Sequence, residues 1–173
     1  MIHSAKFWVD KLKLTKHPEG GYFKEVYRSN EIISKKGLPL RYNSFRAFST
    51  SIYFLLDGKD FSAFHRLKSD ELWHFYEGCP LLIYILFPDG KMATVKLGQD
   101  PSNNEAFQFA IPKGAWFAAK PTDPNTYSLL GCTVAPGFDF ADFELAKRES
   151  LVKKFPQHSK LINELTIANP VSE

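Results

Sequence analysis

The fold class is indicated most clearly by one stretch of the sequence, His65-Arg66-Leu67-Lys68-Ser69-Asp70-Glu71-Leu72-Trp73-His74-Phe75-Tyr76-Glu77-Gly78. Its alternation of apolar and polar residues is typical of β-structure. Its histidine and carboxylate, His65 and Glu71, are separated by an even number of positions. Because side chains alternate along a strand with a period of two, such residues can project to the same face. We therefore expect His65 and Glu71 to share one pocket.

Further short runs with the composition of strands lie on both sides of this stretch. Turn residues separate them, and Asp89-Gly90 between two apolar runs is the clearest hairpin signal. Strands this short with turn residues this regular are typical of a sandwich or barrel rather than of alternating strands and helices. The sequence therefore predicts a mainly β fold, with strands at 48–56, 62–67, 71–77, 81–87, 91–97, 107–111, 116–119 and 127–134.

The two ends of the chain are predicted to be helical. Ser4 can cap a short helix that ends before Pro18. After Gly137 the apolar residues follow helical spacing, with Asp139 and Ser150 as candidate caps. We expect this C-terminal segment to form a helical cover on the β-core.

Composition and charge narrow the class of protein. The 173 residues, 44% of them hydrophobic, are the size of one ordinary domain. The 22 Lys and Arg are interspersed with 19 acidic residues, so the net charge of +3 predicts a solvated surface rather than a nucleic-acid partner. No segment approaches the roughly 20 apolar residues that span a membrane. We therefore expect a soluble protein without a membrane partner. Cys79 and Cys132 have no CxxC partner, so we expect reduced thiols and a cytoplasmic protein.

Four blocks of the sequence resemble the cupin superfamily, and most closely an uncharacterised branch of small cupins that is a domain of unknown function. The blocks are His17-Pro18-Glu19-Gly20-Gly21-Tyr22-Phe23, Asp70 to Gly78, Pro112-x-Gly114-x-Trp116 and Gly131 to Phe138. The resemblance implies a cupin double-stranded β-helix, or jelly-roll barrel, with its ligand site in the barrel interior, and often a homodimer. We expect a single domain over residues 1–173, with the barrel core at about 20–136 and the helical cover at about 138–167.

The resemblance to metal-binding cupins is incomplete. Those cupins supply two histidines and a glutamate from the first motif and a third histidine from the second. His65 and Glu71 match two of these positions, whereas Leu67 and Phe117 stand where the other histidines would be. His74 could compensate, but its odd offset from Glu71 requires a bulge to turn it inward. We expect no cofactor, and His65, Glu71 and His74 form the alternative set of metal ligands.

A metal-free interpretation uses the same residues. A carboxylate beside an imidazole fixes its tautomer and stabilises its protonated form, which suits a general base near neutral pH. His65 would be the base and Glu71 would orient it. Some metal-free cupins isomerise or epimerise sugar nucleotides in this way with a tyrosine as proton donor, and the resemblance implies Tyr53 or Tyr76 for that role.

Several further residues are candidate ligand contacts. An indole at the barrel mouth can stack on a sugar or a base, and polar groups nearby can fix its orientation. The block His17 to Phe23 is either a lip that contacts the ligand through backbone N–H groups or a tight structural turn. The stretch 31–44 is either a lid or a loop. The predicted contacts are His74, Trp116, Gln108 and Tyr76.

These observations predict a protein that binds a small polar ligand, such as a sugar or nucleotide derivative, and acts as a metal-independent isomerase or epimerase. Two alternatives remain open. One is a binding or sensing protein without chemistry. The other is a metal-dependent oxygenase or hydrolase, in which a bound ion activates oxygen or water.

Overall fold

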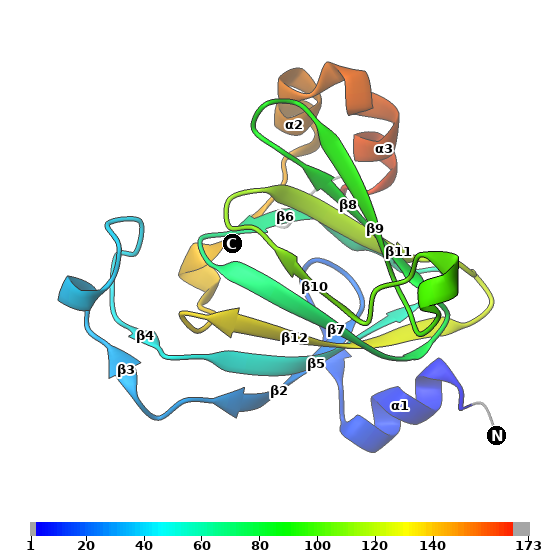
Figure 1. Ribbon diagram of the computed structural model, residues 1–173, viewed down its shortest axis with the longest axis horizontal. Coiled ribbons are helices and arrows are strands. Elements are labelled where there is room, and N and C mark those ends of the chain that lie inside the picture. The colour runs from blue at the N-terminus through cyan, green and yellow to red at the C-terminus, as the bar shows by residue number, and fades with distance from the viewer. Residues whose placement is uncertain (1–2, 168–173) are drawn as a thin grey trace.

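Two antiparallel sheets form the body of the protein, and the computed structural model describes residues 3–167 of the chain (Figure 1). The larger sheet has the order β1 (Thr15–Lys16), β2 (Tyr22–Arg28), β5 (Thr50–Asp57), β12 (Tyr127–Ala135), β7 (Asp70–Gly78) and β10 (Gln108–Ile111). The smaller sheet has the order β13 (Phe143–Leu145), β6 (Ser62–Leu67), β11 (Trp116–Pro121), β8 (Leu81–Leu86) and β9 (Met92–Leu97).

The main core lies between these two sheets. On β7 the buried side chains Glu71, Trp73 and Phe75 alternate with the exposed side chains Leu72 and Tyr76, as the period of a strand requires. The buried residues of β7 pack with apolar residues from both sheets, which makes a contiguous core. Its largest members include Phe54, Trp73, Ile83, Phe117 and Leu130.

Helices cover other faces of the sheets. Helix α1 (Ala5–Leu12) is capped by Ser4, whose hydroxyl accepts a hydrogen bond from the backbone N–H of Phe7 at 3.2 Å. Helices α2 (Arg148–Lys154) and α3 (Ser159–Glu164) pack on the outer face of the smaller sheet, where Trp116 joins their apolar side chains. The short 3₁₀ turns are η1 (Lys35–Gly37), η2 (Pro101–Asn103), η3 (Phe140–Asp142) and η4 (Pro156–His158).

The predicted strands are confirmed, but the segment after Asp139 differs from its prediction. Asp139 caps only the short turn η3, because its carboxylate accepts from the backbone N–H of Ala141. The chain then forms β13, which pairs with β6 and turns Phe143 towards the space between the sheets. Residues 143–145 therefore form a strand rather than the predicted helix, because they pair with the edge of β6. Ser150 lies inside α2 rather than at its start.

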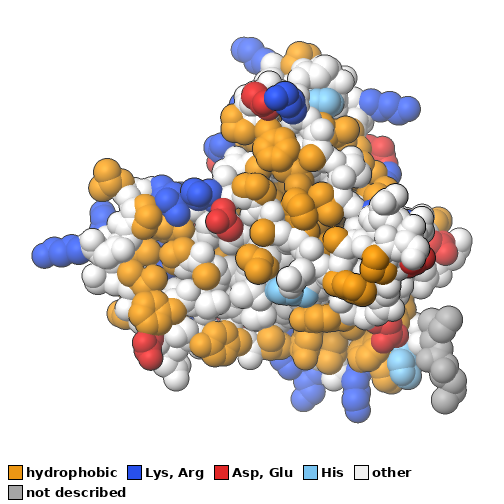
Figure 2. All heavy atoms as spheres, in the orientation of Figure 1, with side chains coloured by type: hydrophobic (Ala, Val, Ile, Leu, Met, Phe, Trp, Pro, Cys, Tyr) orange, Lys and Arg blue, Asp and Glu red, His pale blue; other side chains and the backbone are white. Residues whose placement is uncertain are grey.

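The stretch 31–44 is part of an arm that projects from the barrel, defined as residues 29–48 (Figure 1). A small sheet of β3 (Ile32–Ile33) and β4 (Arg46–Ala47) forms its base. The buried guanidinium of Arg46 donates to both carboxylate oxygens of Asp142 at 2.6 and 2.7 Å, which ties the arm to η3. Figure 2 shows hydrophobic side chains along this arm.

The thiols of Cys79 and Cys132 are both free. Among the helices of residues 3–167, none is both long enough and apolar enough to cross a membrane.

Candidate functional site

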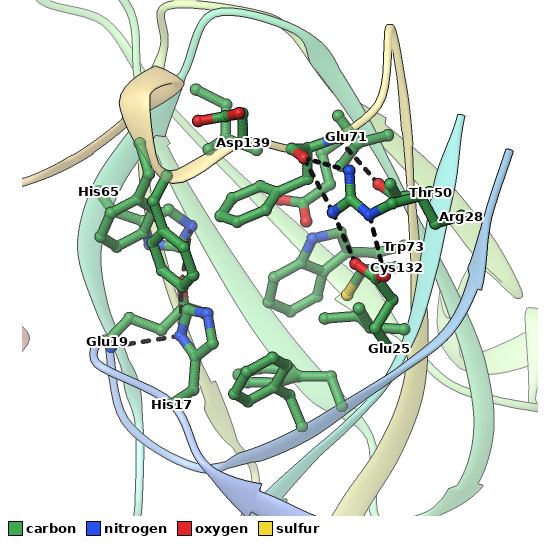
Figure 3. A pocket seen from close by; sticks show the side chains of 18 residues that line it. His17, Glu19, Glu25, Arg28, Thr50, His65, Glu71, Trp73, Cys132 and Asp139 are labelled. Atoms are coloured by element: carbon green, nitrogen blue, oxygen red, sulfur yellow. Dashed lines mark hydrogen bonds and ion pairs between the residues drawn. The ribbon is translucent and has the colours of Figure 1, made fainter. Parts of the chain in front are cut away.

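A cavity of about 320 Å³ lies between the two sheets (Figure 3). Strands of both sheets contribute to it, and so do the turn between β1 and β2 and the segment around η3. Aromatic side chains form much of its wall: Phe23, Phe54, Trp73, Phe138, Phe140 and Phe143. The ionisable side chains that line it are His17, Glu19, Glu25, Arg28, His65, Glu71, Cys132 and Asp139. Polar groups set in an apolar, aromatic wall are typical of a small-molecule site, and this cavity is rich in ionisable groups.

Glu19 lies between two imidazoles in this cavity. Its Oε2 atom is 3.3 Å from Nε2 of His65 and 3.4 Å from Nδ1 of His17. Its Oε1 atom accepts a hydrogen bond from the hydroxyl of Ser62 at 2.8 Å. The backbone holds the residue in place, because the N–H of Ala63 donates to the carbonyl oxygen of Glu19 at 2.8 Å.

The glycine after Glu19 allows this close approach. Gly20 has a φ of +113°, and a Cβ at this position would lie 2.1 Å from the carbonyl oxygen of Phe61. Only glycine fits such a conformation without displacing the backbone. The turn therefore positions the carboxyl group of Glu19 against the strand that carries His65.

The backbone partners of the two imidazoles define their tautomers. Nδ1 of His65 lies 2.7 Å from the carbonyl oxygen of Ala63, which can only accept, so this nitrogen carries the proton and Nε2 faces Glu19 as a lone pair. Nδ1 of His17 accepts from the backbone N–H of Glu19 at 3.3 Å, so it too is a lone pair. A carboxylate between two lone pairs would be repelled. The proton therefore resides on Glu19, as a carboxylic acid that can donate to either imidazole.

The burial of the cluster favours the same protonation states. Burial lowers the pKa of His65 to about 3 and the pKa of His17 to about 4, because a buried imidazolium loses its hydration. Burial, and then the proximity of Glu71, raises the pKa of Glu19 well above its ordinary value. Both imidazoles are therefore neutral at pH 7, and the protonated form of Glu19 is favoured, so that the cluster shares one acidic proton.

Two further polar groups reach the cavity from β7, the carboxyl group of Glu71 and the indole N–H of Trp73. Burial raises the pKa of Glu71 to about 7, while the nearby indole N–H of Trp73 opposes part of this rise. Neither Oε2 of Glu71 nor Nε1 of Trp73 has a hydrogen-bond partner among the described residues, although both atoms are buried. Native proteins rarely leave buried polar atoms unsatisfied, and such atoms call for an explanation.

Arg28 provides the cavity with a guanidinium group, on the opposite side from His65 in the view of Figure 3. Its Nε and Nη2 atoms donate to the carboxylate of Glu25 at 3.0 and 2.7 Å. Its Nη1 and Nη2 atoms also donate to the carbonyl oxygen of Phe138, each at 3.2 Å. The hydrogen bonds with Glu25 raise the pKa of this guanidinium, and the charge of Asp139 adds to the rise. The protein itself therefore neutralises this cation.

The structure brings His65 and Glu71 into one cavity, as their spacing predicts. It does not support the predicted role of Glu71 as the group that orients His65. The carboxyl group against His65 is that of Glu19, which approaches from the turn before β2. The carbonyl of Ala63 fixes the tautomer of His65 from the other side.

The other predicted residues do not line the cavity. Tyr53, His74, Tyr76 and Gln108 belong to the outer face of the larger sheet, where the rings of Tyr53 and Tyr76 are 6.2 Å apart and Gln108 pairs with His74. Tyr53 and His74 each follow or precede a residue that lines the cavity, so they occupy the opposite strand parity. Trp116 faces outward from the smaller sheet, under α2 and α3, with the guanidinium of Arg66 4.6 Å from its ring. Tyr53 is therefore not placed to donate a proton to a ligand in the cavity.

The alternative set of metal ligands is not assembled. His74 lies on the outer face, where its Nε2 atom is 3.3 Å from Oγ1 of Thr133. The register shift between β7 and β12 comes after this residue, opposite Leu129 and Leu130, and does not turn it inward. Across residues 3–167, no group of three His, Cys, Asp or Glu side chains has an arrangement that would hold a metal ion.

Sequence reasoning missed Glu19, His17 and Arg28 as cavity residues. The block His17 to Phe23 was predicted to contact a ligand, if at all, through its backbone. In the structure its side chains make the contribution. The available signal was a histidine and a glutamate two positions apart before paired glycines, at a turn that returns to the barrel.

Comparison with known proteins agrees with this architecture. The family model of the cupin superfamily (DUF985) matches residues 6–146. An uncharacterised protein of Saccharomyces cerevisiae, YML079W, is 30% identical over 155 residues, which cover 84% of this chain and 76% of the yeast protein.

Solved structures show the same relationship. Protein SO0799 from Shewanella oneidensis has a TM-score of 0.88 at 37% identity, over 97% of this chain and 100% of the other. A hypothetical protein from Leishmania major has a TM-score of 0.85 at 33% identity, over 95% of this chain and 99% of the other. Oxalate decarboxylase from Bacillus subtilis shares the fold alone, at 15% identity and a TM-score of 0.51 over 87% of this chain and 36% of the other. The chain therefore belongs to the cupin superfamily, in the family DUF985.

Proposed function

We propose that this protein binds a small polar molecule in the cavity between its sheets and moves a proton on it, as a metal-independent isomerase or epimerase does. One observation carries the proposal: two buried carboxyl groups with raised pKa values, Glu19 and Glu71, line the same aromatic-walled cavity. Perturbed ionisable groups gathered in a pocket are characteristic of acid–base sites.

The two carboxyl groups suit complementary roles. With a pKa of about 7, Glu71 is present in both protonation states near neutral pH, which is the condition for an efficient general base. Glu19 is the acid, because its proton lies between two imidazole lone pairs. His65 is a positioning residue in this scheme, since its Nε2 atom orients the proton of Glu19.

A balanced step follows from these states. The carboxylate of Glu71 removes a proton from a carbon next to a carbonyl group, and the electron pair moves onto the carbonyl oxygen. Glu19 then gives its proton to the substrate carbon, and the carbonyl reforms. The product leaves with the same number of protons, and exchange with water restores the two carboxyl groups.

The proposed ligand class is a sugar or nucleotide derivative. Aromatic rings of the wall can stack on a sugar or base, and carboxyl groups accept hydrogen bonds from hydroxyl groups. A binding protein without chemistry would use the same contacts. The two functions differ only in whether a carbon-bound proton of the ligand is exchanged.

Deuterium exchange distinguishes these functions. The protein is incubated in D₂O with a panel of reducing sugars and ketoses, and proton NMR follows loss of the signals of protons next to the carbonyl. We expect exchange on at least one member of the panel, and a loss of at least 100-fold in rate with Glu71→Gln or Glu19→Gln. Glu144→Gln, at an exposed pair with Arg66, is the matched control. Saturable binding without exchange would support the binding protein, and unchanged exchange in both variants would contradict the assigned roles.

We also propose a homodimer. The outer face of the larger sheet carries the exposed apolar side chains of Leu72 and Tyr76. A second copy that pairs with this face would remove them from water.

A further inference from the structure

We propose that the ligand is an uncharged molecule with a ring-shaped apolar body, that a hydroxyl or amide group on it bridges Glu71 and Trp73, and that phosphate esters and carboxylates are excluded. This inference rests on the proposed function only in taking the same cavity as the ligand site. It narrows the ligand class and excludes sugar nucleotides that would place their phosphates in the cavity.

The two unsatisfied atoms of β7 are complementary to one particular kind of group. Oε2 of Glu71 needs a donor when it is ionised, and Nε1 of Trp73 needs an acceptor. The two residues are two positions apart on one strand, so both side chains project into the cavity. A hydroxyl group or a primary amide supplies a donor and an acceptor together. An ether or a ketone supplies only an acceptor, and an ammonium group supplies only donors.

The charges around the cavity disfavour an anion. Glu25, Asp139 and the ionised fraction of Glu71 are negative, and Arg28 is the one permanent cation among the described residues that line it. Glu25 and the carbonyl of Phe138 already occupy that guanidinium. The imidazoles of His17 and His65 are neutral at pH 7, so they do not compensate an anion. A phosphate or carboxylate would therefore enter a site of low dielectric constant without a free cation.

A cation is not the best fit either. An ammonium group would be attracted by the carboxylates and the aromatic faces. It would leave the indole N–H of Trp73 without an acceptor, and a buried donor without a partner weakens binding. An uncharged group that both donates and accepts satisfies the two atoms at once.

The aromatic wall defines the rest of the ligand. Six aromatic side chains line the cavity, from β2, β5, β7 and the segment around η3. Rings of this kind pack best on another flat apolar surface, with faces offset or edges against faces. The cavity volume of about 320 Å³ lies at the small end of the range for small-molecule sites, so one ring with a short polar substituent is a suitable probe.

The test is a titration with four monocyclic probes, followed by ligand-observed NMR. Benzyl alcohol and benzamide carry the bridging group, toluene lacks it, and benzoate replaces it by an anion. At pH 7.5 we expect benzyl alcohol and benzamide to bind roughly tenfold more tightly than toluene, since each probe makes one or two additional hydrogen bonds. Benzoate should bind more weakly than toluene.

Two variants remove the bridge from either side. Glu71→Leu removes the acceptor and Trp73→Phe removes the donor, and each should reduce the advantage of benzyl alcohol over toluene to about twofold. The matched controls Glu144→Leu and Trp116→Phe lie outside the cavity and should leave all four affinities unchanged. Because Trp73→Phe preserves an aromatic core residue, it tests the bridge even where Glu71→Leu fails to fold.

The outcomes separate this inference from the proposed function. Equal binding of benzyl alcohol and toluene, or tight binding of benzoate, overturns the inference and leaves the cavity as a ligand site. Binding that none of the cavity variants changes would show that the probes bind elsewhere, which overturns the inference and leaves the proposed function to the exchange measurement. Failure of all four probes to bind the native protein overturns the inference, whereas the proposed function is still tested by deuterium exchange on the sugars.

Discussion

Oε2 of Glu19 lies 3.3 Å from Nε2 of His65, and the N–H of Ala63 on the same strand donates to the carbonyl oxygen of Glu19. The main chain thus joins the turn that carries the acid to the strand that carries the imidazole. The relationship makes Glu19, rather than Glu71, the carboxyl group that determines the behaviour of His65.

The tautomers of the two histidines can be observed directly. We expect His65 to carry its proton on Nδ1 and His17 on Nε2, because their other nitrogens face the acid proton of Glu19. Nitrogen-15 NMR of the imidazoles between pH 4.5 and 8 should show two neutral rings of opposite tautomer. Glu19→Gln is the informative control, since an amide N–H can still donate to one imidazole. A ring of His65 that protonates with a midpoint near 6.5 would contradict this assignment.

Acid should destabilise the protein through the same two histidines. Their folded-state pKa values, about 3 for His65 and about 4 for His17, lie below the ordinary value of 6.5. As the pH falls from 6.5 towards 4, these two histidines therefore bind protons in the unfolded chain but not in the folded protein. This difference lowers the free energy of unfolding. His65→Asn should reduce the loss, as measured by urea unfolding at pH 6.5 and pH 4.5. His158→Asn, at a half-buried position outside the cavity, is the matched control, and an equal reduction in both variants would contradict this assignment.

Glu71 should have the opposite effect on the pH dependence of stability. Its folded-state pKa of about 7 lies above the ordinary value of 4.5, so the unfolded chain loses the proton first as the pH rises. The wild-type protein should therefore lose stability between pH 4.5 and pH 7, by on the order of 3 kcal/mol for this group alone. We expect Glu71→Gln to become more stable relative to wild type by that order between pH 4.5 and pH 8, in parallel urea titrations. Glu144→Gln, at an exposed position outside the cavity, is the matched control, and an equal trend in both variants would refute the assignment.

The pair of Arg46 and Asp142 should be the most sensitive ion pair in the arm. Both side chains are buried and the contact is bidentate, so removal of one partner leaves a buried charge without compensation. We expect Asp142→Ala to lower the free energy of unfolding by about 3 to 5 kcal/mol. Glu144→Ala, which breaks the half-exposed pair with Arg66, should cost less than about 1 kcal/mol. Similar losses of unfolding free energy for the two variants would show that burial of the Arg46–Asp142 pair does not determine its contribution to stability.

The proposed dimer can be tested at the outer face of the larger sheet. Leu72→Glu combined with Tyr76→Glu places two carboxylates where apolar side chains are now exposed. Light scattering coupled to size exclusion should show a dimer for the native protein and a monomer for this variant. Met92→Glu, at an exposed position of the smaller sheet, should remain a dimer. A native protein that is monomeric at every concentration tested would contradict the proposed homodimer.

Much of the barrel follows from local patterns in the sequence. Strand β6 begins and ends at the predicted residues, because glycine and polar turns delimit it and its apolar side chains are buried. Hairpin signals such as Asp89-Gly90 act over a few residues, so they can be recognised without tertiary information. Strand β13 was missed because its pairing with β6 depends on a distant segment.

The candidate site was only partly predictable for the same reason. Strand parity correctly places His65 and Glu71 in one cavity, and parity applied as strictly to Tyr53 and His74 would have placed them outside it. Glu19 lies in a turn, where no periodicity defines the direction of a side chain. Its position depends on its contacts with Ser62, Ala63 and His65, which are distant in sequence, and with His17, which is in the same turn.

The attachment of the Glu19 turn to β6 bears on the entropy of binding. A ligand that must first order a loop loses affinity, because the restriction of that loop opposes association. Here the hydrogen bond between Ala63 and Glu19, and the close approach of Gly20 to Phe61, fix the turn before any ligand arrives. Binding at this end of the cavity should thus proceed with little loss of backbone freedom, so that even a small molecule with few contacts can be held.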